Sequence, residues 1–397
     1  MKQLTYAGLI ALALAGAFLL GKSAGEPRPI QDLSASEYEI QMRETLQELD
    51  YFARVSGLIR LLDHMDTENL AGGVAAVEGE LDTLTENTIR LFVRVWTRVD
   101  RQNAYEHIIL WPRTKMKYGM VELIFVWAMS NPVEARDALM SIPDEMIREV
   151  SVSSLVGGWA KGGHPGVDEY LIGLDNGPLQ RKLTAVAVTW ILRREGPEAM
   201  LAWAESQSGE GRDGFRRVAM ERAMNQMVPV DPEAALRWAE KHSGKVYAGT
   251  LKRELAKRWV PKDADAAFAW LATLEDPAQR DDLVRVGFTR WSSLDGHAAA
   301  NWISSTELSP YLDPAVAVFA VNQSKAQAER AMIWAARISD QALRNKTQTD
   351  ILRFWIHQAP DLANAWIEAN NLPPNVIAAA RTPNRGRGRT RRPTTLR

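Results

Sequence analysis

The residues that decide the fold lie near the middle of the chain, where positions 231–238 read Asp231-Pro232-Glu233-Ala234-Ala235-Leu236-Arg237-Trp238. The first three of these residues suit the first turn of an α-helix. Aspartate caps the free N–H groups, proline fits the first helical position, and glutamate is stabilised by the positive end of the helix dipole. Ala235 and Trp238 are three positions apart and share one face. The stretch therefore predicts a helix that presents a small residue and a large ring to a neighbour.

The tryptophan at the end of this stretch recurs at a constant spacing. One series, with thirty-two positions between successive members, consists of Trp238, Trp270, Trp302, Trp334 and Trp366. A second series precedes it by eleven positions and consists of Trp259, Trp291 and Trp355, with Gln323 at the step that lacks a tryptophan. Toward the N-terminus the spacing alternates between thirty-one and thirty-two positions, at Trp96, Trp127, Trp159 and Trp190. Counted from about His64, the pattern predicts nine or ten units.

Each unit is predicted to contain two helices of roughly 11–12 residues joined by short turns. Helix starts like the one after Asp231 recur at Asn131-Pro132, Gly196-Pro197-Glu198, Asp263-Ala264-Asp265 and Pro360-Asp361. The preceding helices end on the second tryptophan series, as in Thr250–Trp259 and Asp281–Trp291. Runs of β-branched residues with a period of two are missing, so almost no sheet is expected.

These units predict an all-α fold, a right-handed superhelical α-solenoid of about nine or ten helix pairs with a period of about 32 residues. The architecture resembles tetratricopeptide, Sel1-like and HEAT arrays over about residues 55–372. It resembles most closely the Asp-Pro-x-Ala-Ala-x-x-Trp helical repeats of bacterial envelope proteins. The tetratricopeptide unit is slightly longer, at about 34 residues, and has a Trp-Leu-Gly-Tyr pattern that this chain lacks. The resemblance implies binding of a partner on a repeat surface, without chemistry of its own.

The N-terminus indicates export. Met1-Lys2 is followed by an uncharged, mostly apolar run from Leu4 to Leu20, whose length lies between a secretory signal and a membrane-spanning helix. Residues 1–25 are therefore predicted to be a signal peptide or an N-terminal membrane anchor, and either would place the body on the periplasmic side. Residues 26–54 are predicted as a linker and leading helix, 55–372 as the solenoid, and 373–397 as a disordered tail. The chain contains no cysteine, which suits an oxidising compartment.

The recurring tryptophans are interpreted as core residues. A ring at the same phase of every unit fills the same space between stacked helices. Stacking on a sugar or a peptide is the alternative interpretation.

No pattern of catalytic residues is present. The six histidines are scattered without metal-ligand spacing, and no carboxylate pair or Gly-x-Ser-x-Gly motif stands out. The glycine-rich stretch 157–164 lacks the Lys-Ser/Thr ending of a phosphate loop and is predicted to be a flexible turn between helices. We therefore expect no catalytic, cofactor-binding or metal-binding residues, no cofactor and no enzymatic activity. A carbohydrate-active enzyme built as an α/α toroid remains the alternative.

Two segments are candidate contact sites. Trp111 lies outside both tryptophan series, and with Arg113, Lys115, Lys117 and Tyr118 it forms a candidate partner-binding segment, because Trp, Tyr and Arg dominate interface hot spots. The alternative is a loop tryptophan folded onto the edge of the solenoid.

The second candidate is the basic C-terminal tail. Residues 381–397 contain seven arginines and no acid, which leaves a net charge of −8 on the rest of the chain. Arg385, Arg387, Arg389, Arg391 and Arg392 are candidate anion-binding residues for anionic lipid or polysaccharide. Export argues against nucleic acid as the partner. A solvated tail without a partner is the alternative.

Together these features predict a non-enzymatic scaffold or adaptor of the cell envelope that binds a protein or peptide partner through a helical-repeat surface. The alternatives are the toroidal enzyme and a binder of anionic polymers or membrane surfaces that acts through the tail.

Overall fold

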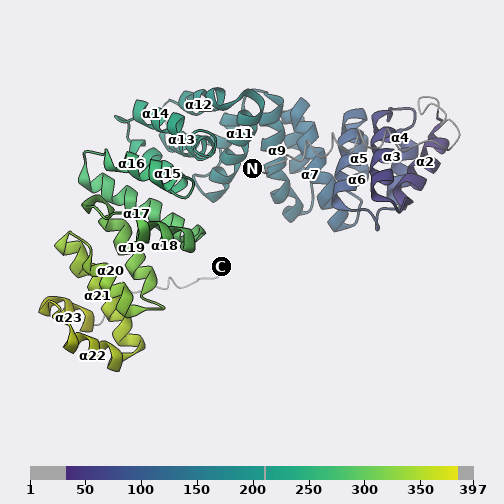
Figure 1. Ribbon diagram of the computed structural model, residues 1–397. Coiled ribbons are helices and arrows are strands. Elements are labelled where there is room, and N and C mark those ends of the chain that lie inside the picture. Colours follow the sequence, from purple (N-terminus) through teal and green to yellow (C-terminus); the bar gives the residue numbers. More distant parts are fainter. Residues whose placement is uncertain (1–32, 210–211, 383–397) are drawn as a thin grey trace, which may run out of the picture. The chain divides into compact units, whose positions relative to one another are not determined.

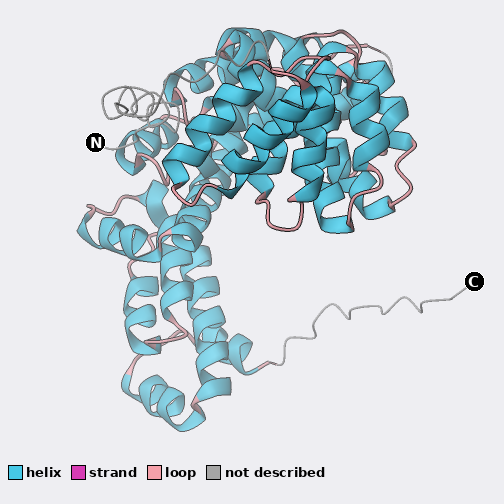
Figure 2. Ribbon diagram, turned by 90° about the vertical axis from the view of Figure 1, so that its right-hand side faces the viewer, coloured by secondary structure: helices cyan, strands magenta, loops and turns pink. Residues whose placement is uncertain are grey.

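The computed structural model describes residues 33–209 and 212–382, and within these residues the chain is helical and contains no strand (Figures 1 and 2). The all-α prediction is confirmed. The chain divides into two units, with the boundary after Arg216, inside helix α13 (Asp213–Met227). Each unit is described by itself below.

The helices of the first unit vary from 6 to 18 residues. They are α2 (Ala35–Gln47), α3 (Tyr51–Asp63), α4 (Leu70–Gly79), α5 (Glu86–Val99), α6 (Arg101–Ile108), α7 (Arg113–Ser130), α8 (Pro132–Met140), α9 (Glu145–Gly162), α10 (Val167–Ile172), α11 (Pro178–Glu195) and α12 (Pro197–Ser206).

The second unit continues the alternation of longer and shorter helices. Its helices are α14 (Pro232–Lys241), α15 (Ala248–Trp259), α16 (Ala264–Ala272), α17 (Pro277–Leu294), α18 (Gly296–Ser305), α19 (Asp313–Gln323), α20 (Ala328–Ala336), α21 (Gln341–Gln358), α22 (Pro360–Ala369) and α23 (Pro374–Arg381), with a short 3₁₀ turn η2 (Pro310–Leu312) before α19.

Within each unit, helices pack against helices that are close in sequence. In the first unit the long helices α5, α7, α9 and α11 each contact the next, and short helices such as α8 contact the long helices on either side. In the second unit α15, α17, α19, α21 and α23 contact one another in the same order. This arrangement of neighbour contacts is compatible with a helical-repeat fold.

The tryptophans form much of the core. Nine of the fourteen are buried, and the other five are partly exposed. Tryptophans of the two series that are eleven positions apart contact each other through their rings. The ring centroids are 5.7 Å apart in Trp259–Trp270, 5.8 Å in Trp291–Trp302 and 5.7 Å in Trp355–Trp366. Burying such a ring removes a large apolar area from water, which favours folding. The core interpretation is confirmed for the buried tryptophans.

The same contact is made earlier in the chain by other aromatic residues. Eleven positions after Trp96 stands His107, with ring centroids 5.6 Å apart, and eleven positions after Trp159 stands Tyr170, at 5.8 Å. The position that accepts the second ring is therefore aromatic after Trp96 and Trp159, whereas Ala138 and Leu201 stand there after Trp127 and Trp190.

The cap at Asp231 agrees with the sequence interpretation, and the helix lengths agree with it only in part. The Asp231 side chain accepts a hydrogen bond from the backbone N–H of Ala234 at 2.8 Å, and Pro232 is the first helical residue. The predicted length of roughly 11–12 residues is met by α15 and α19, which have 12 and 11 residues. It is wrong for α17, which has 18 residues because it begins at Pro277, directly after its cap Asp276, and continues past Trp291.

The glycine-rich stretch 157–164 is helical over most of its length, which corrects the prediction of a flexible turn. Helix α9 runs through it to Gly162 and ends at Gly163, whose φ of 77° is the left-handed conformation that glycine favours at a helix end. A Cβ atom at Gly158 would lie 2.1 Å from the carbonyl oxygen of Phe125 in α7, and one at Gly162 would lie 2.3 Å from that of Met129. These glycines allow α7 and α9 to approach closely.

Packed helices also lie outside the predicted solenoid range of residues 55–372. Helix α2, within the predicted linker and leading helix, contacts α4, and its Tyr38 is fully buried with its hydroxyl donating to the Leu61 carbonyl at 2.7 Å. Helix α23, within the predicted disordered tail, packs on α21 with Val376 buried, and its Ala379 carbonyl accepts from Arg353 at 2.8 Å. The hydrophobic contacts of these two helices explain why they fold.

In the stretches 33–209 and 212–382, no helix has the length and apolar character required to span a membrane. The predicted signal or anchor, residues 1–25, lies outside the described residues.

Candidate functional site

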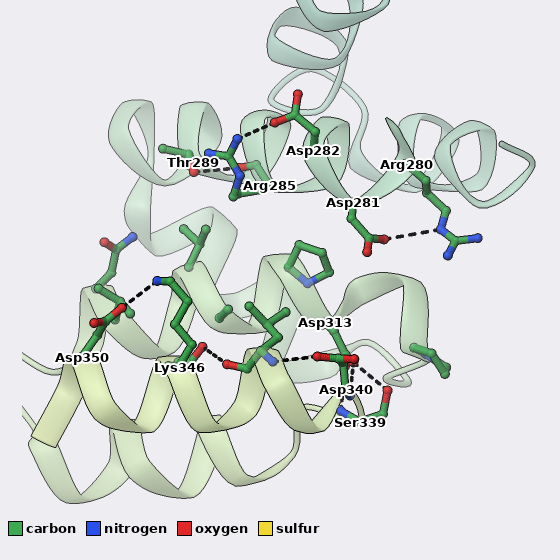
Figure 3. Close-up of a pocket in the computed structure, with 18 residues that line it drawn as sticks. Arg280, Asp281, Asp282, Arg285, Thr289, Asp313, Ser339, Asp340, Lys346 and Asp350 are labelled. Atoms are coloured by element: carbon green, nitrogen blue, oxygen red, sulfur yellow. Dashed lines mark hydrogen bonds and ion pairs between the residues drawn. The ribbon is translucent and has the colours of Figure 1, made fainter. Parts of the chain in front are cut away.

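A large hollow lies in the second unit, along helix α19 and between α17 and α21 (Figure 3). We call it the α19 groove. Its volume is about 990 Å³, and residues from these three helices and from the loop before α21 line it. A hollow of this size accommodates several amino-acid side chains or a drug-sized ligand.

The floor of the groove is apolar. It is formed by α19 residues at helical spacing, Pro314, Ala317, Val318 and Val321. Helix α19 has 11 residues, whereas α17 and α21 on either side have 18. A short helix with small side chains between two long helices leaves the space open.

The repeat register explains why the floor and the walls differ. Thirty-two positions before Pro314 and Ala317, α17 carries Asp282 and Arg285, and thirty-two positions after Pro314 α21 carries Lys346. Charged residues at these positions in the flanking helices are replaced by apolar ones in α19. The groove is thus an apolar strip between two charged walls.

The α17 wall carries charges of both signs. Asp282 is paired with Arg285 and also accepts from Arg253 of α15 at 2.5 Å. Asp281 is 3.6 Å from Arg280. Loss of solvation raises the pKa of Asp281, and the charges of Asp313 and Asp340 raise it further, while Arg280 opposes the shift.

The α21 wall is held by the buried carboxylate of Asp313, at the start of α19. Asp313 accepts hydrogen bonds from the Ser339 backbone N–H at 3.0 Å, from the Ser339 hydroxyl at 2.6 Å and from the Asp340 N–H at 2.8 Å (Figure 3). Asp340 in turn caps α21. This network fixes the start of α21 relative to α19.

Further along α21, Asp350 lies between two cations. Its carboxylate is 2.8 Å from Lys346 Nζ and 3.3 Å from Arg353 Nη1. Each wall therefore offers both acidic and basic groups to a ligand, above a floor that can take an apolar side chain. This arrangement suits binding of a polypeptide segment.

The predicted segment around Trp111 does not form an exposed anchor. Trp111 is buried, its ring centroid is 6.1 Å from that of Trp96, and its indole N–H donates to Glu78 Oε1 at 2.9 Å. Folding of this residue onto the neighbouring helices, the alternative interpretation, agrees with its position. The exposed-anchor interpretation of Trp111 is corrected, because indole burial leaves no free face for a partner.

The next two residues of that segment lie in the first turns of α7. Arg113 is exposed and pairs with Asp144, the cap of α9, at 2.7 Å. The Lys115 ammonium donates to the carbonyls of Asp82 and Leu84 at 3.1 and 2.7 Å. These two contacts tie α7 to the loops before α9 and α5.

The remaining two residues of the segment lie next to each other in sequence and in space. Lys117 is exposed, with its ammonium 6.0 Å from the centroid of the partly exposed Tyr118 ring. Within the segment, Lys117 and Tyr118 therefore form a partly exposed pair of a cation and an aromatic ring.

The candidate tail residues, Arg385, Arg387, Arg389, Arg391 and Arg392, lie outside the described residues.

The part of the chain that the structure describes contains no group of three or more His, Asp or Glu side chains placed to hold a metal ion. Several histidines have local partners instead. His107 lies 3.1 Å from Glu78, and His164 Nε2 lies 2.9 Å from the Met129 carbonyl.

The residues of the α19 groove were missed by the sequence interpretation. A signal existed, because Gln323 at the end of α19 marks the one step of its series without a tryptophan. Comparison of equivalent positions in successive repeats would also have shown that Pro314 of α19 stands where α17 has Asp282 and α21 has Lys346.

Comparison with family models, with curated proteins and with solved structures finds no match to this chain.

Proposed function

We propose that the protein is a non-enzymatic scaffold that binds a segment of a partner protein in the α19 groove. The observation that carries the proposal is the apolar strip of α19 between two walls that each present charges of both signs. An apolar side chain of the partner would occupy the floor, and its polar groups would meet the walls, as in other helical grooves that bind peptides.

The scaffold is proposed to be a right-handed superhelical solenoid of about nine or ten helix pairs. Support comes from the regular spacing of the tryptophans and from the contacts of each long helix with the next within a unit. Repeats that contact only their neighbours leave extended surfaces available to a ligand.

The cellular location is proposed to be the periplasmic side of the envelope, with residues 1–25 as an anchor or a cleaved signal. The apolar run from Leu4 to Leu20 supports this location. Mass spectrometry of the mature N-terminus distinguishes the two forms, and recovery of the intact chain in the cytosolic fraction would contradict both.

The binding proposal can be tested by filling the groove. Ala317→Trp places an indole on the floor, and Val246→Trp is the matched control, because Val246 is fully exposed elsewhere in the second unit. A random peptide library is selected on the native protein, and the selected peptides are then measured on both variants.

Peptides selected on the native protein should bind Ala317→Trp at least about tenfold more weakly, equivalent to about 1.4 kcal/mol, and should bind Val246→Trp unchanged. Equal binding to all three proteins would show that the groove is not the site. Circular dichroism melting curves establish that both variants are folded.

A further inference from the structure

A second feature lies in the first unit, where a pair of aromatic rings connects α7 with α11, two long helices that are separated by α9. Phe125 of α7 and Trp190 of α11 have ring centroids 5.2 Å apart. The pair meets across α9 because Gly157 has no side chain, and a Cβ atom there would lie 2.9 Å from Trp190 Nε1. The rings therefore form a firm base on the surface of α7, α9 and α11.

Two cations lie over this base. The Lys161 ammonium is 5.4 Å from the centroid of Phe125 and 5.1 Å from that of Trp190. The Arg193 guanidinium is also 5.1 Å from the Trp190 centroid. Cation–π attraction holds these groups in place without neutralising their charge.

Two further cations, Arg94 and Arg98, lie one turn apart on the same face of α5. Arg94 reaches across to α7, where it pairs with the buried carboxylate of Glu122 at 2.6 Å. Loss of solvation lowers the pKa of Lys161, and so do the charges of Arg94 and Arg98, against the opposite effect of Glu122. The cations are thus close enough for their repulsion to affect one another.

Positive charge exceeds negative charge in this cluster. Glu122 is its carboxylate and is already paired with Arg94. Within residues 33–209 and 212–382, no ion-pair partner is found for Arg98, Lys161 or Arg193. A ligand with carboxylates would supply the missing negative charge and relieve the repulsion.

We infer that the cluster formed by Arg94, Arg98, Lys161 and Arg193 around Phe125 and Trp190 binds an acidic, extended segment of a partner protein. Adjacent packed helices lie about 8–10 Å apart, so the path from α5 to α11 measures roughly 30 Å. An extended chain of about nine residues covers that length. Its carboxylates would reach cations from successive helices as it crosses them.

The geometry favours a peptide over a nucleic acid or a membrane. Lys161 and Arg193 each lie 5.1 Å from the centroid of the Trp190 ring, so a base that stacks there would compete with these cations for the ring. Lys161 is partly buried, which keeps it from a flat bilayer surface but not from a narrow chain. The cluster belongs to the first unit, and its function does not depend on the α19 groove.

The experiment uses the full chain and a labelled oligoglutamate peptide as the probe, at low and at moderate salt. The test variant is Lys161→Gln with Arg193→Gln. The matched control is Lys245→Gln with Lys325→Gln, which removes the same charge from two exposed positions of the second unit. Both proteins retain the arginine-rich tail, so binding by the tail contributes equally to both.

The test variant should bind oligoglutamate about tenfold more weakly than the native chain, which corresponds to the loss of two partly exposed ion pairs. The control variant should bind like the native chain. Amine acetylation read by mass spectrometry provides a site-specific measurement: the probe should protect Lys161 and leave Lys245 and Lys325 reactive.

Equal binding by the two variants, or absence of Lys161 protection, would overturn the inference. Tighter binding of polyuridylate or of anionic vesicles, lost in the same test variant, would also overturn it and would assign the cluster to nucleic acid or to lipid. Melting curves of both variants exclude a loss of folding as the cause of weak binding.

Discussion

One indole nitrogen in the second unit lacks a hydrogen bond that its equivalents in the first unit make. The Trp96 N–H donates to Asn103 Oδ1 at 3.0 Å, and the Trp127 N–H donates to Glu134 Oε2 at 3.2 Å. Both acceptors stand seven positions later, at the third position of the following helix. At the equivalent place after Trp259 stands Ala266, and the buried Trp259 N–H has no partner among the residues described.

Ala266→Glu should therefore stabilise the protein. The new carboxylate would accept from Trp259 and would lie in the first turn of α16, where negative charge is favourable, for a gain of about 1 kcal/mol in the free energy of unfolding. Urea denaturation measures the gain. Ala266→Gln, which keeps the acceptor without the charge, should retain part of it; a gain for the glutamate alone would assign the effect to the helix dipole.

The contact between Arg113 and Asp144 should make stability depend on pH. Hydrogen bonding and charge from Arg113, with the backbone N–H of Ile147, lower the pKa of Asp144 in the folded protein. Because the folded pKa is below the unfolded value of about 3.9, the contact stabilises above that pH and its contribution is lost as pH falls through the folded pKa.

A double-mutant cycle with Arg113→Gln and Asp144→Asn tests this dependence. The coupling between the two side chains should be measurable at neutral pH and should decrease as the pH falls below about 4. A coupling that stays constant with pH would mean that the carboxylate charge plays no part. A measurable coupling would show that Arg113 contributes to stability through its contact with Asp144.

At the scale of helices, glycine determines how closely α7 and α9 pack. Gly158→Ala would place a methyl group against the Phe125 carbonyl, so the helices must separate, and we expect a loss of about 1–3 kcal/mol. Gly296→Ala is the control, because a Cβ atom at this position in the first turn of α18 meets nothing within 4 Å. It should be neutral or slightly stabilising. Equal effects in urea denaturation would contradict the role of close packing.

The position of α21 depends on a carboxylate outside that helix. Asp313→Ala removes the carboxylate that accepts three hydrogen bonds from Ser339 and Asp340 and leaves these donors unsatisfied. The free energy of unfolding should fall by about 3 kcal/mol. Asp340→Ala removes an ordinary helix cap and should cost about 1 kcal/mol. The ratio of the two losses in urea denaturation checks this assignment, and a smaller loss for Asp313 would contradict it.

The sequence predicted helices well where the signal is local and poorly where it depends on packing. The cap at Asp231 and the tryptophan contacts follow from residue type and spacing, which are visible in one dimension. The interpretation of Gly157 and Gly158 failed because a glycine in a turn and a glycine at a close helix contact look alike in sequence. The α19 groove was missed because it arises from the difference between three helices rather than from any one of them.

For the molecule as a whole, contacts between helices close in sequence imply that damage remains local. Hydrogen exchange in the Gly158→Ala variant should increase in α7 and α9 and remain unchanged in α19 to α23. Mass spectrometry of peptic fragments resolves these regions. Faster exchange throughout the chain would instead indicate a single cooperative body.

The short length of α19 has a consequence for how such a chain could change its specificity. Its recess exists because a short helix with small side chains lies between two helices of 18 residues. Shortening a different long helix and replacing its outward side chains with smaller ones would create a recess in another repeat, while the neighbouring helices stay unchanged. If the proposed binding in this groove is correct, editing a single helix would be enough to move the binding site.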